Sequence, residues 1–378
     1  MSQEKPGFVH DKTGFLCGRN FMQTKFQRWK ESITATDIVM WVIGFALLVL
    51  IIFGSILTLR AGRYTPVQWF DFVIYGLAQG SIYALVAMGY TLVYGVLRMI
   101  NFAHSEVFMS GPFTAYYVAA YFYRSSLLES HPVICLIIVF IVSMSISTLI
   151  AFLLERIAYR PLRNAPRLIP LITAIGASFT LMYLFRGLYG TGFQAYPVWK
   201  IFDGKWALFQ GLEIGKMQLF VIFAAALVMI ALYMFIQRTR IGKAVRSVSE
   251  DKEAASLMGV DIDKTISITF IIGGAAAGAA GVLYALVFKQ VFFMMGFIPG
   301  IKAFTAAVLG GIGNIPGAML GGLLLGLLES IGPALFLDGY NVVAPYQLKD
   351  AIAFLVLVLV LIFRPTGLLG ERLAVKKA

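Results

Sequence analysis

Long apolar runs separated by short polar segments dominate the chain. Ten such runs can be placed, at residues 38–59, 67–98, 107–123, 132–154, 168–188, 218–236, 265–288, 301–312, 317–333 and 346–364. Most of them reach the roughly 20 residues that a helix needs to cross the hydrocarbon core of a bilayer, which is about 30 Å thick. The pattern therefore predicts an all-α polytopic membrane protein with about ten helical segments.

Two of the runs do not fit one straight crossing. The run at 67–98 is longer than a single span requires, and we expect a break between Gly89 and Gly95. The run at 301–312 is too short to cross as a helix. One interpretation is a re-entrant segment whose backbone groups are satisfied by neighbouring helices.

Lys and Arg gather in four of the polar segments, namely 1–37, 155–167, 237–264 and the tail after Phe363. Because basic residues are enriched in cytoplasmic loops, we expect all four segments and both termini on the cytoplasmic side. This topology requires ten crossings, with 300–311 and 317–332 counted separately and "GGIGNIPG" between them. The net charge of +12 is then a topology signal, and no nucleic-acid-binding face is expected.

A short motif occurs twice in the chain. "AQGSIYALV" (78–86) and "AAGVLYALV" (279–287) share the pattern A-x-G-x-x-Y-A-L-V and fall in crossings two and seven, which run in opposite directions. This placement indicates an inverted repeat, an architecture that puts a transport pathway near the membrane midplane between the two halves. The alternative is chance similarity between two helices rich in Gly and Ala.

Sites that could drive transport are scarce. An ion-coupled transporter places ionisable groups deep in the membrane, whereas here they lie near the ends of their runs. They are Asp71, Arg186, Lys302, Glu329 and Asp350. The phosphate-binding pattern G-x-x-x-x-G-K-[ST] is absent, and "GLEIGKM" has the wrong spacing. The energy for active transport is therefore expected to come from a partner protein.

No metal or cofactor is expected. The two cysteines, Cys17 and Cys135, are far apart in the chain, and no cluster of His and Cys has the spacing of metal ligands.

The stretch "SEDKEAASLMGVD" (249–261) is unusually polar for this chain. Ser247 and Glu250 form the S-x-x-E pattern of a capping box, so we expect a short helix from Val248 to Met258 that stops at Gly259. At about 1.5 Å per residue such a helix is roughly 16 Å long, too short to span a membrane. Asp261 or Asp263 can cap the membrane helix that follows.

This short helix offers contacts to another protein. Ala254 and Ala255 would allow close approach, and Leu257 and Met258 would serve as apolar anchors. The alternative interpretation is a solvated amphipathic helix in a loop.

Several motifs resemble a known family. "EAASLMG" (Glu253 to Gly259) resembles the EAA-x-x-x-G coupling loop of ATP-binding-cassette importer permeases. Together with it, four further stretches resemble the LivH-type permease of branched-chain amino acid importers: "GSIYALVAMGYTLVYGVLRMINFAHSEVFM" (80–109), "ERIAYRPLR" (155–163), "AFTAAVLGGIGNIPGAMLGG" (303–322) and "RPTGLLG" (364–370). The resemblance covers roughly residues 65 to 370.

The resemblance implies a set of partners. They are a second, LivM-like permease, two cytoplasmic ATP-binding subunits and an external substrate-binding protein, assembled in a bacterial inner membrane. ATP binding would push on the short helix and tilt the bundle, so this chain itself is not expected to be an enzyme. The coupling residues would be Glu253, Ala254, Ala255, Leu257, Met258 and Gly259.

The resemblance also suggests how the chain is divided into segments. We expect a basic cytoplasmic segment at 1–37, an extra transmembrane helix at 38–62, a permease domain at 63–364 with its coupling loop at 237–264, and a cytoplasmic tail at 365–378. The extra helix departs from many relatives of the family.

Two polar stretches are candidates for the translocation pathway. They supply Asn101, His104 and Glu106 from "INFAHSE" and Gly310, Gly311, Asn314 and Pro316 from "GGIGNIPG". The alternatives are structural: Asn101 or Ser105 caps the next helix, with Glu106 favoured by the helix dipole, and "GGIGNIPG" is a plain turn. Likewise Arg156, Arg160 and Arg163 either contact an ATPase or anchor at lipid phosphates.

The expected substrate is a neutral amino acid, since a zwitterion with an apolar side chain suits a pathway with few buried charges. A permease for urea or short amides is the close alternative. A passive channel and an ion-coupled secondary transporter are rivals from other classes.

Overall fold

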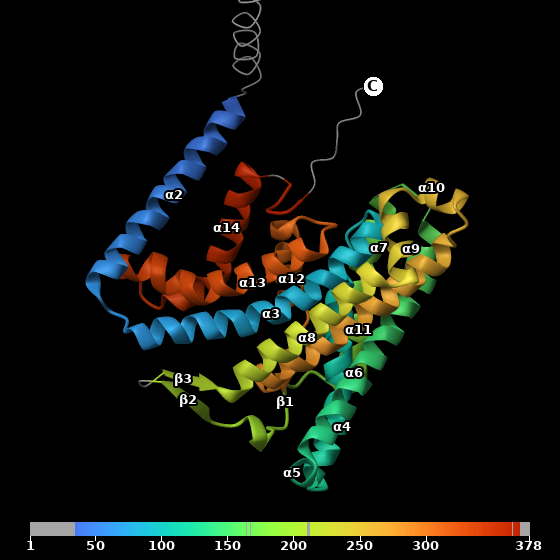
Figure 1. The fold of residues 1–378 in the computed structure, drawn as a ribbon, viewed down its shortest axis with the longest axis horizontal. Coiled ribbons are helices and arrows are strands. Elements are labelled where there is room, and N and C mark those ends of the chain that lie inside the picture. Colours follow the sequence, from blue (N-terminus) through green and yellow to red (C-terminus); the bar gives the residue numbers. More distant parts are fainter. Residues whose placement is uncertain (1–34, 164, 167, 210–211, 365, 371–378) are drawn as a thin grey trace, which may run out of the picture. The chain divides into compact units, whose positions relative to one another are not determined.

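The computed structural model describes residues 35–370 apart from 164, 167, 210–211 and 365 (Figure 1). The basic segment 1–34, with Cys17, and the last eight residues lie outside the described part. The long helices are α2 (Ala35–Ala61), α3 (Pro66–Leu97), α4 (His104–Arg124), α6 (Pro132–Leu154), α7 (Leu168–Tyr189), α8 (Lys216–Arg238), α11 (Ile262–Phe288), α12 (Phe297–Gly310), α13 (Ile315–Gly332) and α14 (Lys349–Phe363). They match the ten apolar runs one to one, which confirms the all-α polytopic class. Among the described residues, eight helical stretches are long and apolar enough to cross a membrane.

Short elements connect these helices. They are α5 (Leu127–Ser130), α9 (Arg240–Glu250), α10 (Lys252–Leu257) and the strands β1 (Gln194–Ala195), β2 (Lys205–Phe209), β3 (Leu212–Gly215) and β4 (Gln290–Val291). β2 and β3 form an antiparallel hairpin before α8, and β1 pairs antiparallel with β4. The chain divides into two units, residues 1–52 and 53–378, and all elements from α3 onward belong to the second.

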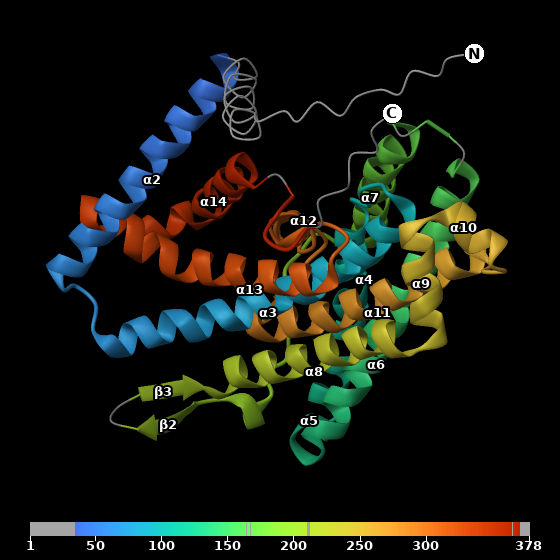
Figure 2. The ribbon, with the colours of Figure 1, turned by 45° about the horizontal axis from the view of Figure 1, so that its top comes forward.

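Glycines bring the central helices of the second unit into close contact. A Cβ on Gly326 would lie 2.3 Å from the Cα of Gly80, and one on Gly322 would lie 2.3 Å from the Cα of Ala84. These pairs hold α13 against α3, as Figure 2 shows. Small residues spaced four apart allow such approach where lipid provides no hydrophobic force between helices. The two copies of the repeated motif lie on α3 and α11, which also pack together; the inverted symmetry stays a prediction.

The expected break in α3 was wrong, because one unbroken helix runs from Pro66 to Leu97. Gly89 serves packing instead: a Cβ there would lie 2.3 Å from Nε2 of His104 and 3.3 Å from the carbonyl oxygen of Gly273. The helix exceeds one membrane thickness, yet most of its surface is covered by other helices of the protein.

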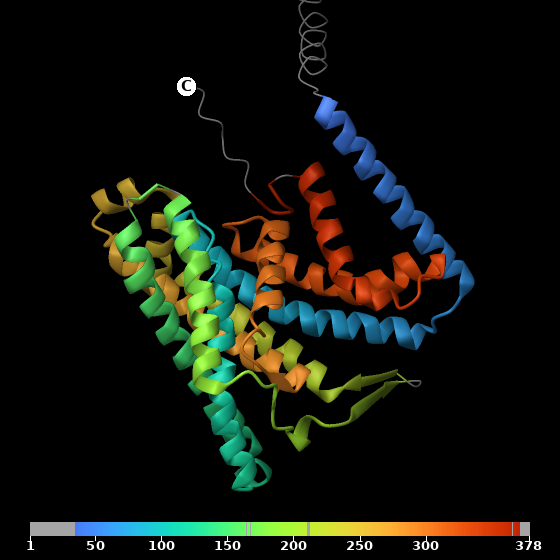
Figure 3. The same cartoon turned by 180° about the vertical axis from the view of Figure 1, so that it is seen from behind.

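Contacts between loops define two ends of the bundle. Arg160 and Arg163 contact Asp263, and Arg98 donates to the carbonyl oxygen of Ser249, so segments 155–163 and 239–263 lie at one end. We call this the basic end. At the opposite end Lys200 pairs with Glu129. Figure 3 shows the basic end and the β-hairpin at opposite extremes of α8. The expected topology requires this clustering of basic loops on one side.

Candidate functional site

α9 and α10 lie at the basic end, and we call them the coupling segment after the role that the sequence predicts for this stretch. Thr239 caps α9, where its hydroxyl accepts from the amide of Gly242 at 3.0 Å. Asp251 caps α10, where one carboxylate oxygen accepts from the amides of Glu253 at 2.9 Å and Ala254 at 3.0 Å. The single helix expected from Val248 to Met258 was therefore wrong.

The physical reason is that the capping signal at Ser247 lies inside an amphipathic helix that starts earlier. The Ser247 hydroxyl donates to the carbonyl oxygen of Lys243, one turn back in α9. Asp251 has an extended backbone (φ −149°, ψ 114°), which ends α9 and starts α10.

The C-terminal side of the coupling segment matches the sequence prediction. Gly259 has a φ of +83°, in the left-handed region that glycine tolerates without strain. Asp261, one of the two expected caps, accepts from the amide of Lys264 at 3.0 Å and so starts α11. The chain thus passes directly from α10 into a membrane helix.

α10 presents a small apolar tip to its surroundings. The exposed fractions of Leu257 and Met258 are 88% and 84%, whereas Ala255 is only 4% exposed and faces the bundle. An open groove of about 420 Å³ runs along the helix, lined by Lys252, Glu253, Ser256, Leu257 and Ile262. Two large apolar side chains that project from a polar helix suit insertion into a partner protein.

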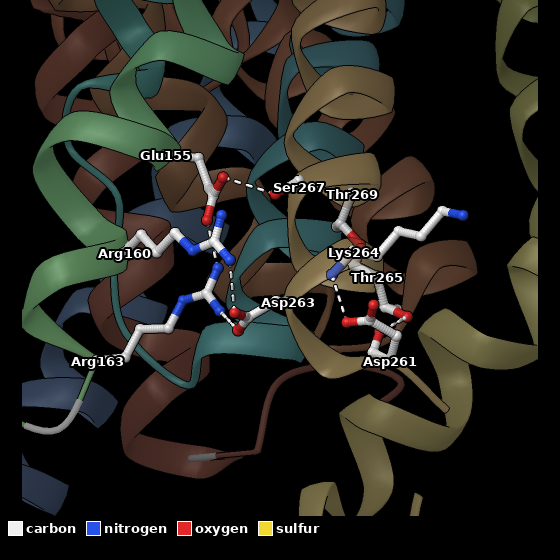
Figure 4. A network of polar contacts seen from close by, with 9 residues as sticks. All are labelled: Glu155, Arg160, Arg163, Asp261, Asp263, Lys264, Thr265, Ser267 and Thr269. Atoms are coloured by element: carbon white, nitrogen blue, oxygen red, sulfur yellow. Dashed lines mark hydrogen bonds and ion pairs between the residues drawn. The ribbon is translucent and has the colours of Figure 1, made fainter. Parts of the chain in front are cut away.

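A network of charges fixes the start of α11 to the segment after α6 (Figure 4). Arg163 donates to both Glu155 and Asp263, and Arg160 donates to Asp263 at 2.7 Å. Ser267 donates to the second oxygen of Glu155, also at 2.7 Å. Neither of the expected roles for Arg160 and Arg163, contact with an ATPase or with lipid phosphate, accounts for these internal bonds.

The polar stretch before α4 is buried. Asn101 and His104 are each 2% exposed, and Glu106 is fully buried. The hydroxyl of Tyr159 donates to Oδ1 of Asn101 at 2.6 Å, and that of Ser178 donates to Glu106 at 3.3 Å. Within the described chain, Asn101 Nδ2, His104 Nε2 and Glu106 Oε2 have no hydrogen-bond partner.

The capping role expected for Asn101 or Ser105 was wrong. The residue at the cap of α4 is Ala103, which makes no side-chain bond there, and the Ser105 hydroxyl donates to the carbonyl oxygen of Phe102. Asn101 is instead turned toward Tyr159, whose segment is far away in the sequence.

A small cavity joins this stretch to α12. Its volume of about 10 Å³ is close to the smallest space that holds one water molecule. It is lined by Tyr90, Thr91, Tyr94, Ile100, Asn101, Phe304, Ala307 and Ile312. The structure therefore brings Asn101 beside α12, and a role in the pathway stays a prediction.

The second candidate stretch forms a tight turn. Asn314 caps α13 by accepting from the amide of Gly317 at 3.0 Å, and its Nδ2 donates to the carbonyl oxygen of Leu369 at 2.9 Å. Gly311 needs its φ of +108°, and a Cβ on Gly310 would overlap the backbone of Gly317. None of Gly310, Gly311, Asn314 and Pro316 lines the cavity just described.

The sequence did not predict a buried charge cluster formed by α12, α13 and α14. Lys302 lies 2.9 Å from Glu329 and 2.7 Å from Asp350, and Lys302 and Glu329 are almost completely buried. Tyr83 and Gln79 of α3 also donate to Glu329, at 3.1 and 3.2 Å. The only signal in the sequence is a single lysine and a single glutamate in otherwise apolar runs.

Comparison with known proteins identifies the family. Residues 72–361 match the family described as "Branched-chain amino acid transport system / permease component". The chain belongs to this permease family. The permease is 43% identical over 303 residues to BraD of Pseudomonas aeruginosa, which is named a high-affinity branched-chain amino acid transport system permease protein. The aligned residues cover 79% of the permease and 95% of BraD.

Two more distant relatives are also named branched-chain amino acid transport permeases. The LivH permease protein of Escherichia coli, with the same description, is 40% identical over 300 residues, which is 78% of this permease and 94% of LivH. A probable LivH of Methanocaldococcus jannaschii is 30% identical over 261 residues, which is 66% of this permease and 77% of that protein. No solved structure matches the permease. The family relationship and the long apolar helices together identify the permease as a multi-pass membrane protein.

Proposed function

We propose that this permease forms the membrane pathway of an ATP-binding-cassette importer for branched-chain or other neutral amino acids. It works in a bacterial inner membrane with a second, LivM-like permease and an external substrate-binding protein. Two cytoplasmic subunits hydrolyse ATP, and this chain performs no catalysis.

The observation that carries the proposal is the geometry of α10. The helix is capped at both ends and held between α8, through α9, and α11. Its apolar tip is exposed at the end where the basic loops gather. In this proposal Glu253, Ala254, Leu257, Met258 and Gly259 face the ATP-binding subunit, while Ala255 packs the helix against the bundle.

The pathway passes close to the buried stretch before α4. Asn101, His104 and Glu106 support this part of the proposal, because each has a buried polar atom without a partner in the described chain. Such groups are costly unless a ligand or water satisfies them during transport. Gly310, Gly311, Asn314 and Pro316 contribute by shaping the turn between α12 and α13.

A neutral amino acid suits the charges of the bundle. Lys302 is compensated by Glu329 and Asp350, so this cluster offers no free cation to an anionic solute. A branched-chain substrate is supported by relatives that are named branched-chain amino acid transport permeases. Binding of leucine, isoleucine, valine and urea to the cognate external protein would separate amino acid import from urea import.

The coupling role is tested with Glu253→Lys in the complete importer. Because the Glu253 side chain is exposed, we expect unchanged folding, weaker co-purification of the ATP-binding subunits and reduced ATP-dependent uptake of leucine. The matched control is Glu213→Lys, the same charge reversal in the hairpin at the opposite end. Undiminished assembly and uptake in the Glu253 variant would contradict the assignment.

A second experiment addresses the other functional classes. The purified permease alone, in liposomes, should not accumulate leucine against a gradient. Uphill transport by the chain alone would overturn the proposal in favour of an ion-coupled transporter, and downhill flux equal to that of the full complex would favour a channel.

A further inference from the structure

The coupling segment is bound to the bundle at two places. At its first helix, Arg98 at the end of α3 donates to the carbonyl oxygen of Ser249. After its second helix, Asp263 in the first turn of α11 binds Arg160 and Arg163. Any displacement of α10 therefore acts on α3 and on the segment after α6, as well as on α11.

Arg163 differs from Arg160 in its surroundings. Its side chain is 16% exposed, against 36% for Arg160, and it alone reaches the fully buried Glu155. An exposed ion pair such as Arg160–Asp263 contributes little, because solvent screens it. A buried pair is different, since loss of one partner leaves an uncompensated charge.

The two carboxylates that Arg163 joins belong to different helices. Glu155 continues α6 in a single π-helical turn, Glu155–Tyr159, a distortion that is often found at functional positions. Asp263 and Ser267 are four residues apart on α11, so they share one face, and Ser267 donates to the oxygen of Glu155 that Arg163 does not bind. The planar guanidinium can bind both acids at once.

Further along, α6 and α11 are in close contact. A Cβ on Gly278 would lie 2.8 Å from the Cα of Met144, and one on Gly274 would lie 2.9 Å from the carbonyl oxygen of Ser147. The Ser143 hydroxyl donates to the carbonyl oxygen of Gly278 at 2.8 Å. A push that reaches both helices at the basic end would move them together.

We propose that Arg163 is a positioning residue that joins the coupling segment to α6, so that a push on α10 displaces α6 and α11 as one body. The inference rests on the proposed function, because it concerns how that push reaches the pathway. Lys252, the first residue of α10, supports the geometry: burial, and then the charges of Arg163 and Arg98, lower its pKa. Both arginines thus lie within electrostatic range of the start of α10.

The test uses the complete importer in liposomes, with its ATP-binding subunits, second permease and external binding protein, and with leucine as the transported probe. Arg163→Gln should leave assembly and ATP hydrolysis intact but lower leucine uptake per ATP by at least about fivefold, the lower end of typical coupling between sites. Arg124→Gln is the matched control, because this exposed arginine in the last turn of α4 lies away from the basic end.

Two further variants separate positioning from simple charge compensation. Arg163→Lys keeps a cation beside Glu155 but loses the planar fork, so uptake per ATP should stay low. Recovery with lysine would show that only the charge matters and would overturn the proposal. Loss of Arg163 alone leaves the buried carboxylate of Glu155 without its cation, which destabilises the fold. The double variant Glu155→Gln with Arg163→Gln removes that buried charge. Its leucine uptake per ATP should still be low.

The remaining outcomes are also decisive. Normal uptake per ATP in Arg163→Gln would overturn this inference while leaving the proposed function intact. Loss of ATP-binding subunits from the variant would show a docking role and also overturn it. Absence of ATP-dependent uptake in the unmodified complex would instead contradict the proposed function.

Discussion

Replacing Lys302 with methionine removes the cation that lies between Glu329 and Asp350. The side chain of Lys302 is 4% exposed and that of Glu329 is 1% exposed, whereas that of Asp350 is 44% exposed. The Glu329 contact therefore dominates, and removal of one partner of such a buried pair costs about 3–5 kcal/mol. Tyr83 and Gln79 still donate to Glu329 in this variant, so we expect a loss at the lower end of that range. The free energy of unfolding should fall by about 3 kcal/mol.

The assay is thermal unfolding of the purified permease in detergent, followed by tryptophan fluorescence. Lys302→Met should lower the midpoint by about 4 °C, because an unfolding entropy of about 2.1 cal/mol/K per residue in a chain of 378 residues converts about 3 kcal/mol into a shift of that size. The double variant with Glu329→Gln should recover part of this loss, because no uncompensated buried charge remains. Lys205→Met is the control, since its pair with Glu213 is exposed and should not affect the midpoint. An unchanged midpoint for Lys302→Met, or a double variant less stable than the single one, would refute the reasoning.

Three further changes have expected outcomes. Gly326→Ala places a Cβ 2.3 Å from the backbone of Gly80 and should lower the unfolding midpoint, whereas Gly176→Ala, with nothing within 4 Å, should not; equal midpoints would contradict the close packing of α3 and α13. Leu257→Ser should leave the midpoint unchanged and reduce co-purification of ATP-binding subunits, because the side chain is 88% exposed; normal co-purification would exclude it as an anchor. Asp251→Ala removes two amide contacts at the start of α10 and should destabilise that helix by about 1 kcal/mol, seen as faster amide exchange in 252–258 only.

Local patterns in the sequence were enough to locate the membrane helices. Each of the ten apolar runs became a helix, because a backbone in lipid must satisfy its own hydrogen bonds. The left-handed Gly259 and the cap at Asp261 were also predictable, since their partners lie within a few residues. The family was recognisable for a similar reason, because its motifs are continuous stretches of sequence.

Other features depend on contacts between distant segments, and local patterns misjudged them. The expected break at Gly89 is absent from α3, and His104 of α4 fills the space beside this glycine. Asn101 and Ser105 do not cap α4, although both are good capping residues, and Asn101 binds Tyr159 instead. Whether these residues line a pathway stays a prediction.

Sequence alone determined that this chain crosses the membrane repeatedly, which loops are basic, and where the polar segment before α11 ends. Only the tertiary structure decided how the charges pair: Lys302 with Glu329 and Asp350, and Arg163 with Glu155 and Asp263. The reason is physical. Apolar periodicity and capping act between residues close in the chain, whereas the cost of a buried charge is met by whichever partner the packed helices bring near, and Arg163 and Asp263 are 100 residues apart in the sequence.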